Sequence, residues 1–266
     1  MELKLKKRNY YGAVLAAAAL AVGVFSTFRS LDRTLESRAV GLPTTTKPVI
    51  ILDPGHGGMD GGAVANGITE KDLNLAIAHK VREFCTLFGF EVRMTREEDV
   101  SIHDEDKDTV RAQKNSDLKN RLAIMTADPS AVVVSIHMNK FTESRIKGAQ
   151  VFYAPKSQGS DLLAQTIQDN FRQLLQPDNT RQTKKADSAL FLLYNNTVTP
   201  AVLVECGFIS NPEEAAQLSK ADYQDRVAFA ICYSLLQFHD GSLVDEAPEA
   251  PPESAPPESV STTPAQ

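Results

Sequence analysis

The stretch from Val49 to Gly58 reads V-I-I-L-D-P-G-H-G-G and is the strongest indication of the fold in this chain. Its first half is a short apolar run, typical of a buried β-strand, and its second half is a glycine-rich turn with His56 at the tip. A histidine that a strand holds in such a turn is a candidate metal ligand or acid–base group. The glycines of this turn are Gly55, Gly57, Gly58 and Gly61. They let the chain bend sharply and let other groups approach the backbone.

Outward from this stretch, the pattern alternates between strand and helix. Short runs rich in Val or Ile predict strands at 48–53, 90–95, 131–136, 148–154 and 201–205. Apolar residues at helical spacing predict helices at 70–88, 116–127, 159–175 and 221–238. Thr69, with Asp72 three residues later, predicts a capping box at the start of the first helix. We therefore expect a single three-layer α/β domain, in which a twisted, mainly parallel sheet of about five to six strands carries helices on both faces.

The two ends of the chain do not share this pattern. Four basic residues among the first eight precede an uncharged run from Tyr10 to Phe28, so residues 1–30 predict a signal peptide or an N-terminal membrane anchor, and we favour the uncleaved anchor. The positive flank is expected to stay in the cytoplasm, which places the rest of the chain outside. Residues 31–47 predict a linker and 48–239 the folded domain. Residues 240–266 are rich in Pro, Glu and Ser and predict a disordered tail.

Charge and cysteine content exclude several classes of protein. The formal net charge of −6 gives no electrostatic support to a nucleic-acid partner. The chain has no Cys-x-x-Cys motif, and its cysteines are an odd number in apolar surroundings: Cys85, Cys206 and Cys232. Neither a disulfide framework nor a cysteine-based metal site is expected.

Ionisable residues end two further strands of the predicted sheet. His137 follows the run 132–136, Glu205 follows 201–204, and Glu70 lies in the first turn of the first helix. In open parallel sheets, ligands bind at the carboxyl ends of the strands, where His56 also lies. Two histidines and one carboxylate are a zinc-ligand set that leaves one position open for an activated water. A second carboxylate can then move the proton of that water. The residues alone leave open whether Glu70 or Glu205 is the ligand.

Four motifs of the chain resemble the zinc-dependent N-acetylmuramoyl-L-alanine amidases of the amidase 3 type. They follow one another in order within residues 48–238: V-I-I-L-D-P-G-H-G-G-M-D-G-G at 49–62, E-K-D-L-N at 70–74, S-I-H-M-N at 135–139 and V-E-C-G-F-I-S-N at 204–211. The lone catalytic domain behind an export segment is most similar to the sporulation and germination-specific, CwlD-like branch. The acidic, Pro-rich tail departs from that pattern.

The resemblance implies roles that the residues left open. His56, Glu70 and His137 fall on the ligands of one zinc ion, and Glu205 falls on the catalytic glutamate. The implied reaction is hydrolysis of the amide between the lactyl group of N-acetylmuramic acid and L-alanine of the peptidoglycan stem peptide.

Further expectations follow from the same resemblance. Asn139 is a candidate substrate or supporting contact, and Asp53 a candidate support for the His56 loop. The motif at 117–121 is expected to be structural. Peptidoglycan is the expected partner, in the cell wall or the spore cortex space, with the membrane contacted through the N-terminal segment. A regulatory protein partner cannot be read from the sequence.

Three alternatives remain at this stage. A zinc peptidase acting on cell-wall peptides would use the same ligands. A non-catalytic peptidoglycan-binding module would lack a ligand or base, yet all four positions are filled. A thiol enzyme would use Cys206 as nucleophile with His56 or His137 as its base.

Overall fold

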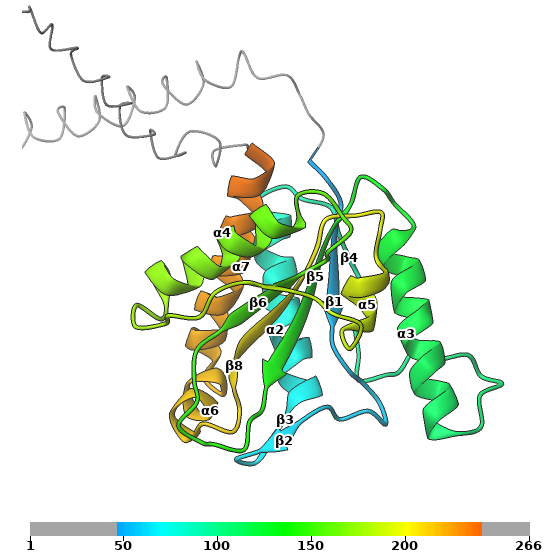
Figure 1. Cartoon of the computed structure of the whole chain (residues 1–266), viewed down its shortest axis with the longest axis horizontal. Coiled ribbons are helices and arrows are strands. Elements are labelled where there is room, and N and C mark those ends of the chain that lie inside the picture. Colours follow the sequence, from blue (N-terminus) through cyan, green and yellow to red (C-terminus); the bar gives the residue numbers. More distant parts are fainter. Residues whose placement is uncertain (1–46, 241–266) are drawn as a thin grey trace, which may run out of the picture. The chain divides into compact units, whose positions relative to one another are not determined.

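The apolar run after Val49 forms a central strand of a six-stranded sheet (Figure 1). The computed structural model describes residues 47–240. The strand order in the sheet is β4-β1-β5-β8-β6-β7. These strands are β1 (Ile50–Pro54), β4 (Val92–Met94), β5 (Val132–Asn139), β6 (Gln150–Tyr153), β7 (Lys184–Lys185) and β8 (Ala201–Phe208).

The sheet is mainly parallel, as predicted. β4, β1, β5 and β8 run in the same direction, whereas β6 is antiparallel to β8. Parallel strands need crossover connections, and the helices between them supply these. The carboxyl ends of β1, β5 and β8 therefore meet at one edge of the sheet.

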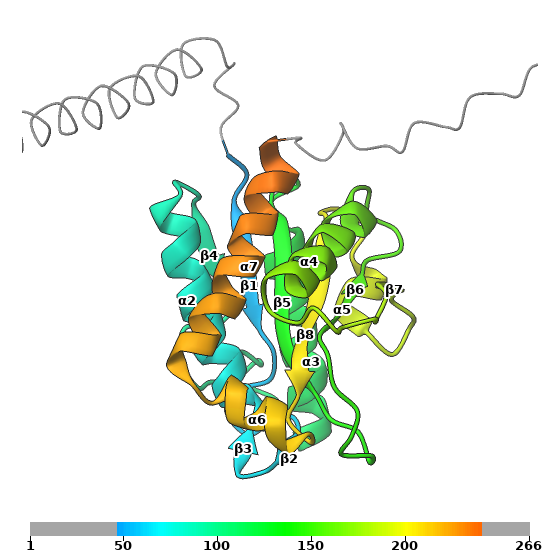
Figure 2. The same ribbon diagram turned by 90° about the vertical axis from the view of Figure 1, so that its left-hand side faces the viewer.

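Helices cover both faces of the sheet, which gives the predicted three layers (Figure 2). On one face lie α2 (Glu70–Leu87), α4 (Ser160–Leu174) and α7 (Ala221–Asp240), and on the other lie α3 (Val110–Thr126) and α5 (Phe191–Asn195). Because successive side chains of a strand point to opposite faces, Val134 packs in the core under the first group and Val133 in the core under the second.

The capping box predicted at Thr69 is wrong, although α2 does begin at Glu70. The Thr69 side chain makes no capping hydrogen bond. Carbonyls of the glycine-rich loop accept the first free N–H groups of the helix instead: Glu70 N donates to Ala63 O at 2.9 Å and Lys71 N to Gly61 O at 3.2 Å. The helix start is thus tied directly to the loop that carries His56.

Other boundaries differ because capping and pairing extend the elements. α3 starts at Val110 rather than 116, since the hydroxyl of Thr109 accepts from Ala112 N at 3.2 Å. β5 and β8 continue past the predicted ends to Asn139 and Phe208. Five short elements were not predicted: β2 (Val64–Ala65), β3 (Ile68–Thr69), β7, α5 and α6 (Pro212–Leu218).

The predicted export segment, linker and tail lie outside the described residues, apart from Lys47 and Asp240 at their edges. Within residues 47–240, no helix is both long and apolar enough to cross a membrane.

Candidate metal centre

The loop after β1 bends so tightly that only glycine fits at two positions next to the site. A Cβ atom on Gly55 would lie 2.1 Å from the imidazole of His137, and one on Gly62 would lie 2.6 Å from both Glu70 Oε2 and the His56 ring. His56 itself has the left-handed φ of +62°. The side chains that approach these two glycines most closely are therefore those of the candidate site: His137 at Gly55, and Glu70 and His56 at Gly62.

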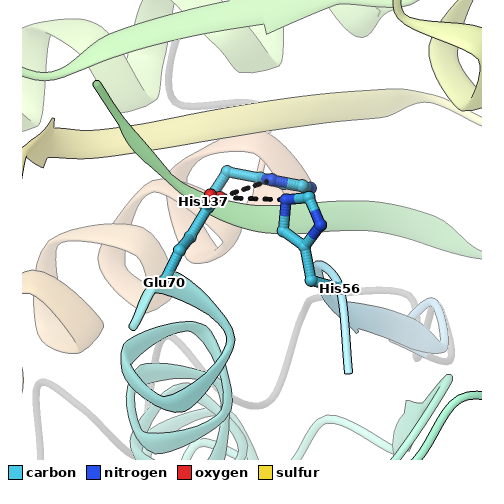
Figure 3. Close-up of side chains that lie close together, drawn as sticks. All are labelled: His56, Glu70 and His137. Carbon is cyan, nitrogen blue, oxygen red and sulfur yellow. Dashed lines mark hydrogen bonds and ion pairs between the residues drawn. The ribbon is translucent and has the colours of Figure 1, made fainter. Parts of the chain in front are cut away.

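Three of the predicted site residues come together at the carboxyl edge of the sheet (Figure 3). Glu70 Oε1 lies 3.3 Å from His56 Nε2 and 3.0 Å from His137 Nδ1, and one ligand atom of each residue lies within 4.8 Å of the others. Tetrahedral zinc, with bonds of 2.0–2.1 Å, needs ligand atoms roughly 3.3 Å apart. Both the nitrogen and oxygen donors and their spacing thus fit a zinc ion.

Glu70 is held from several directions before any ion binds. Its Oε2 accepts from Ala63 N at 2.7 Å, while its Oε1 accepts from Met138 N at 3.2 Å and from Asn74 Nδ2 at 3.4 Å. Its side chain is only 5% exposed. Burial works to raise the pKa of Glu70, but the two histidines outweigh it and hold the pKa far below the ordinary value. The two histidines therefore favour the ionised form of Glu70.

Asp60 orients the His56 ring from the side away from Glu70. Its Oδ2 lies 3.0 Å from His56 Nδ1, and its Oδ1 forms an ion pair of 2.9 Å with Lys114 Nζ. Burial works to lower the pKa of His56, but the contacts with Glu70 and Asp60 raise it to about 9. Two carboxylates around one imidazole create a site that favours positive charge. A carboxylate on the far nitrogen is also the common support of a metal-binding histidine, because it fixes the tautomer.

A buried network beneath the loop fixes its backbone. Arg121, 2% exposed, donates through Nη1 to Asp53 Oδ1 at 2.7 Å and through Nη2 to the His56 carbonyl at 2.7 Å. Arg96 donates to the Pro54 carbonyl at 2.9 Å and to that of Gly55 at 3.0 Å. Arg121 Nη1 also donates to Pro54 O at 2.9 Å. The two guanidinium groups therefore hold the three successive carbonyls of Pro54, Gly55 and His56.

Asp53 is the anchor of this network. It is fully buried and accepts from Arg121, from Thr95 Oγ1 at 2.7 Å and from Ser135 Oγ at 2.6 Å. Burial works to raise the pKa of Asp53, but Arg121 and the two hydroxyls hold it below the ordinary value. The structure thus places Asp53 under the His56 loop.

Glu205 lies beside His137 on the neighbouring strand, since the two residues are direct partners in the parallel β5–β8 pairing. Its Oε2 is buried and has no hydrogen-bond partner among the described residues. Burial raises the pKa of Glu205 to about 7, with the nearby Glu70 adding to the increase and the two histidines opposing it. A buried carboxyl group that titrates near neutral pH suits proton transfer.

The remaining candidates occupy different places. Asn139 ends β5, where its carbonyl accepts from Ile209 N at 2.9 Å and its partner in the register is Phe208. Cys206 follows Glu205 but is fully buried in the core under α2, α4 and α7, and burial raises the pKa of its thiol well above the ordinary value. Its Sγ donates to Val204 O at 3.7 Å.

Sequence reasoning missed Asp60, Lys114 and Arg96. Asp60 carries a recognisable signal, because it follows His56 by four residues inside the same glycine-rich loop. Lys114 lies on a part of α3 that was not expected to be helical, and Arg96 lies after β4 with no motif around it.

Comparison with known proteins decides the family. Residues 50–237 match the family Amidase_3, described as N-acetylmuramoyl-L-alanine amidase. The chain belongs to this family.

Amidases of two organisms resemble the chain over most of their length. The germination-specific N-acetylmuramoyl-L-alanine amidase of Bacillus subtilis (strain 168) is 39% identical over 197 residues, which cover 74% of this chain and 81% of that protein. The structure of the CwlD amidase from Clostridioides difficile in complex with the GerS lipoprotein superposes with a TM-score of 0.70 at 39% identity, covering 73% of this chain and 99% of the other. An N-acetylmuramoyl-L-alanine amidase from Clostridium difficile 630 gives a TM-score of 0.63 at 29% identity, with 74% and 98% covered.

Proposed function

We propose that this amidase-family chain hydrolyses the amide between the lactyl group of N-acetylmuramic acid and L-alanine of the stem peptide, with zinc as its metal. The observation that supports the proposal most strongly is the convergence of His56, Glu70 and His137 beside Glu205, whose Oε2 has no hydrogen-bond partner in the part of the chain that the structure describes. This is a three-ligand set with a proton-transfer group next to it. The chain that carries it belongs to a family described as N-acetylmuramoyl-L-alanine amidase.

The ligand atoms in this proposal are His56 Nε2, His137 Nδ1 and Glu70 Oε1, which the structure brings together. When bound there, a zinc ion supplies Lewis-acid polarisation and activates water near neutral pH. Asp60 keeps the second nitrogen of His56 occupied, so Nε2 faces the site. Arg121 and Asp53 hold the loop at a fixed distance from β5.

Glu205 moves the proton. In its ionised form it accepts a proton from the attacking water, and in its protonated form it returns the proton to the leaving nitrogen of L-alanine. The same group can do both, because burial favours its protonated form and the two histidines favour its ionised form. Oε2, which accepts no hydrogen bond from residues 47–240, is the atom available for these transfers.

The thiol alternative has the least support. Cys206 lies on the core side of β8, whereas Glu205 and His137 are register partners at the site. A buried thiol with a raised pKa is a poor nucleophile.

The relatives support a proposal for the biological setting. Because a germination-specific amidase of Bacillus subtilis is among the relatives, we place the enzyme outside the cytoplasm, acting on peptidoglycan in the cell wall or spore cortex space. The export segment predicted at 1–30 agrees with that location. The Clostridioides difficile relative was solved with a lipoprotein, so a protein partner is proposed for this chain as well.

Product analysis tests the reaction. Zinc-loaded protein is incubated with purified peptidoglycan, and the products are resolved by mass spectrometry. Intact stem peptides with a new N-terminal L-alanine support the amidase. Cleavage within the stem peptide would show the zinc peptidase instead, and binding without any product would show a non-catalytic peptidoglycan-binding module.

A further inference from the structure

A small pocket opens beside the candidate metal centre, between the His56 loop, α3 and α5. It has a volume of about 230 Å³, and both His56 and His137 line it. Pockets that hold whole drug-sized ligands are larger, roughly 300–1,000 Å³. The pocket therefore suits a short segment of the substrate next to the scissile amide.

The other charged side chains of this pocket are already bonded within the protein. Arg121 uses its donors on Asp53, Asp117 and two backbone carbonyls. Asp53 accepts from three side chains, and Asp117 accepts from Arg121, Ser101 Oγ and Ile102 N. These groups therefore stabilise the fold rather than bind a ligand.

Lys114 is the exception among the charged groups that line the pocket. Within residues 47–240 its ammonium group forms one ion pair, with Asp60 Oδ1 at 2.9 Å, and its side chain is 50% exposed. An ammonium group has three N–H donors, so two remain for a ligand. Asp60 also contacts His56, which fixes the lysine at a set distance from the metal ligands.

One part of the pocket wall is apolar. Met59, Leu118 and Leu192 line it, and Met59 is 51% exposed. An apolar patch beside an ammonium group with two unused N–H donors suits a segment that has a small apolar group and a carboxylate. In a muramoyl peptide, the lactyl carboxyl is consumed in the amide bond, so free carboxylates occur only in the peptide part.

We propose that this pocket is a subsite for the stem peptide, in which Lys114 binds the free carboxylate of the acidic residue after L-alanine. The inference rests on the proposed amidase function and adds a specificity to it. Lys114 then favours stem peptides with a carboxylate at this position over those in which it is an amide. A half-exposed ion pair is worth up to about 1 kcal/mol, so the preference in kcat/KM is about fivefold.

A competition experiment tests the subsite. Zinc-loaded enzyme digests a mixture of soluble glycan strands whose stem peptides carry either D-glutamate or D-isoglutamine after L-alanine. Mass spectrometry follows the release of both peptides, and their ratio gives the ratio of kcat/KM values. Because both substrates compete for the same enzyme, a substitution that lowers the activity toward both equally leaves the ratio of kcat/KM values unchanged.

Three variants make the result decisive. Wild type is expected to release the acidic peptide about fivefold faster, Lys114→Gln to release both equally, and Lys114→Glu to prefer the amide. The matched control is Lys119→Gln, an exposed lysine of the same helix that does not line the pocket, and it is expected to keep the wild-type ratio. Equal release by wild type, or an unchanged ratio in Lys114→Gln, would overturn the subsite. Failure of wild type to release either peptide would instead overturn the amidase proposal itself.

Discussion

Replacing Glu205 by glutamine in the metal-free protein should change the way in which stability depends on pH. An ordinary glutamate has a pKa of 4.5, whereas burial raises that of Glu205 to about 7. Between these values, the folded state binds more protons than the unfolded state, so the free energy of unfolding falls as the pH rises. The substitution leaves a neutral side chain of the same size and removes this dependence.

The magnitude follows from the two pKa values. Each pH unit is worth about 1.4 kcal/mol, so the difference between 4.5 and about 7 amounts to about 3 kcal/mol. Above pH 7 the wild-type protein carries the full cost of the buried carboxylate, and below pH 4.5 it carries none. Glu205→Gln should therefore be more stable than wild type by about 3 kcal/mol at pH 8, and by much less at pH 5.

Urea unfolding with chelator present, at pH 5 and pH 8, measures the difference. Other titrating groups, including His56 and Glu70, are common to both proteins and largely cancel. The control is Glu83→Gln, an exposed glutamate in the interior of α2, which should change stability by less than about 0.5 kcal/mol at either pH. If Glu205→Gln gives the same difference at both pH values, burial does not raise the pKa of the Glu205 carboxyl group.

Three further predictions concern the surroundings of the site. Asp60→Asn should weaken zinc affinity about 10- to 100-fold, because His56 loses the carboxylate that orients it; competition with a chromophoric chelator measures this, and an unchanged affinity would exclude the role. Arg121→Met should destabilise the protein by about 3–5 kcal/mol, since Asp53 is left buried without its cation; a loss below 1 kcal/mol in urea unfolding would contradict the account. Cys206→Ala should keep amide cleavage that is sensitive to chelators, and loss of cleavage with correct folding would revive the thiol mechanism.

Much of the fold was predictable because each main strand of the sheet is a short apolar run. The run at 50–54 is buried throughout, as central parallel strands are. The short elements escaped prediction for a physical reason. β2 and β3 have two residues each, too few to show a strand pattern, and they pair with each other across a turn at Asn66 and Gly67, which both have a positive φ.

The residues of the candidate site also fall into two groups, those that the sequence predicts and those that it does not. Residues at the ends of strands, such as His56, His137 and Glu205, were predictable because the topology of a parallel sheet brings those ends together. Lys114 and Arg96 reach the site from elements whose own sequence carries no mark of it. Their contacts depend on side-chain packing between segments far apart in the chain, such as the 41 positions between Arg96 and Gly55.

Zinc content and amide cleavage, measured together on three proteins, test the central claim most directly. Wild type and Glu205→Gln should bind zinc equally, because Glu205 is not a ligand, whereas His137→Ala should lose it. Cleavage of the muramoyl–L-alanine amide should fall at least roughly 100-fold in Glu205→Gln despite its bound zinc. Full cleavage by Glu205→Gln, or zinc binding and cleavage retained by His137→Ala, would contradict the assignment of these residues.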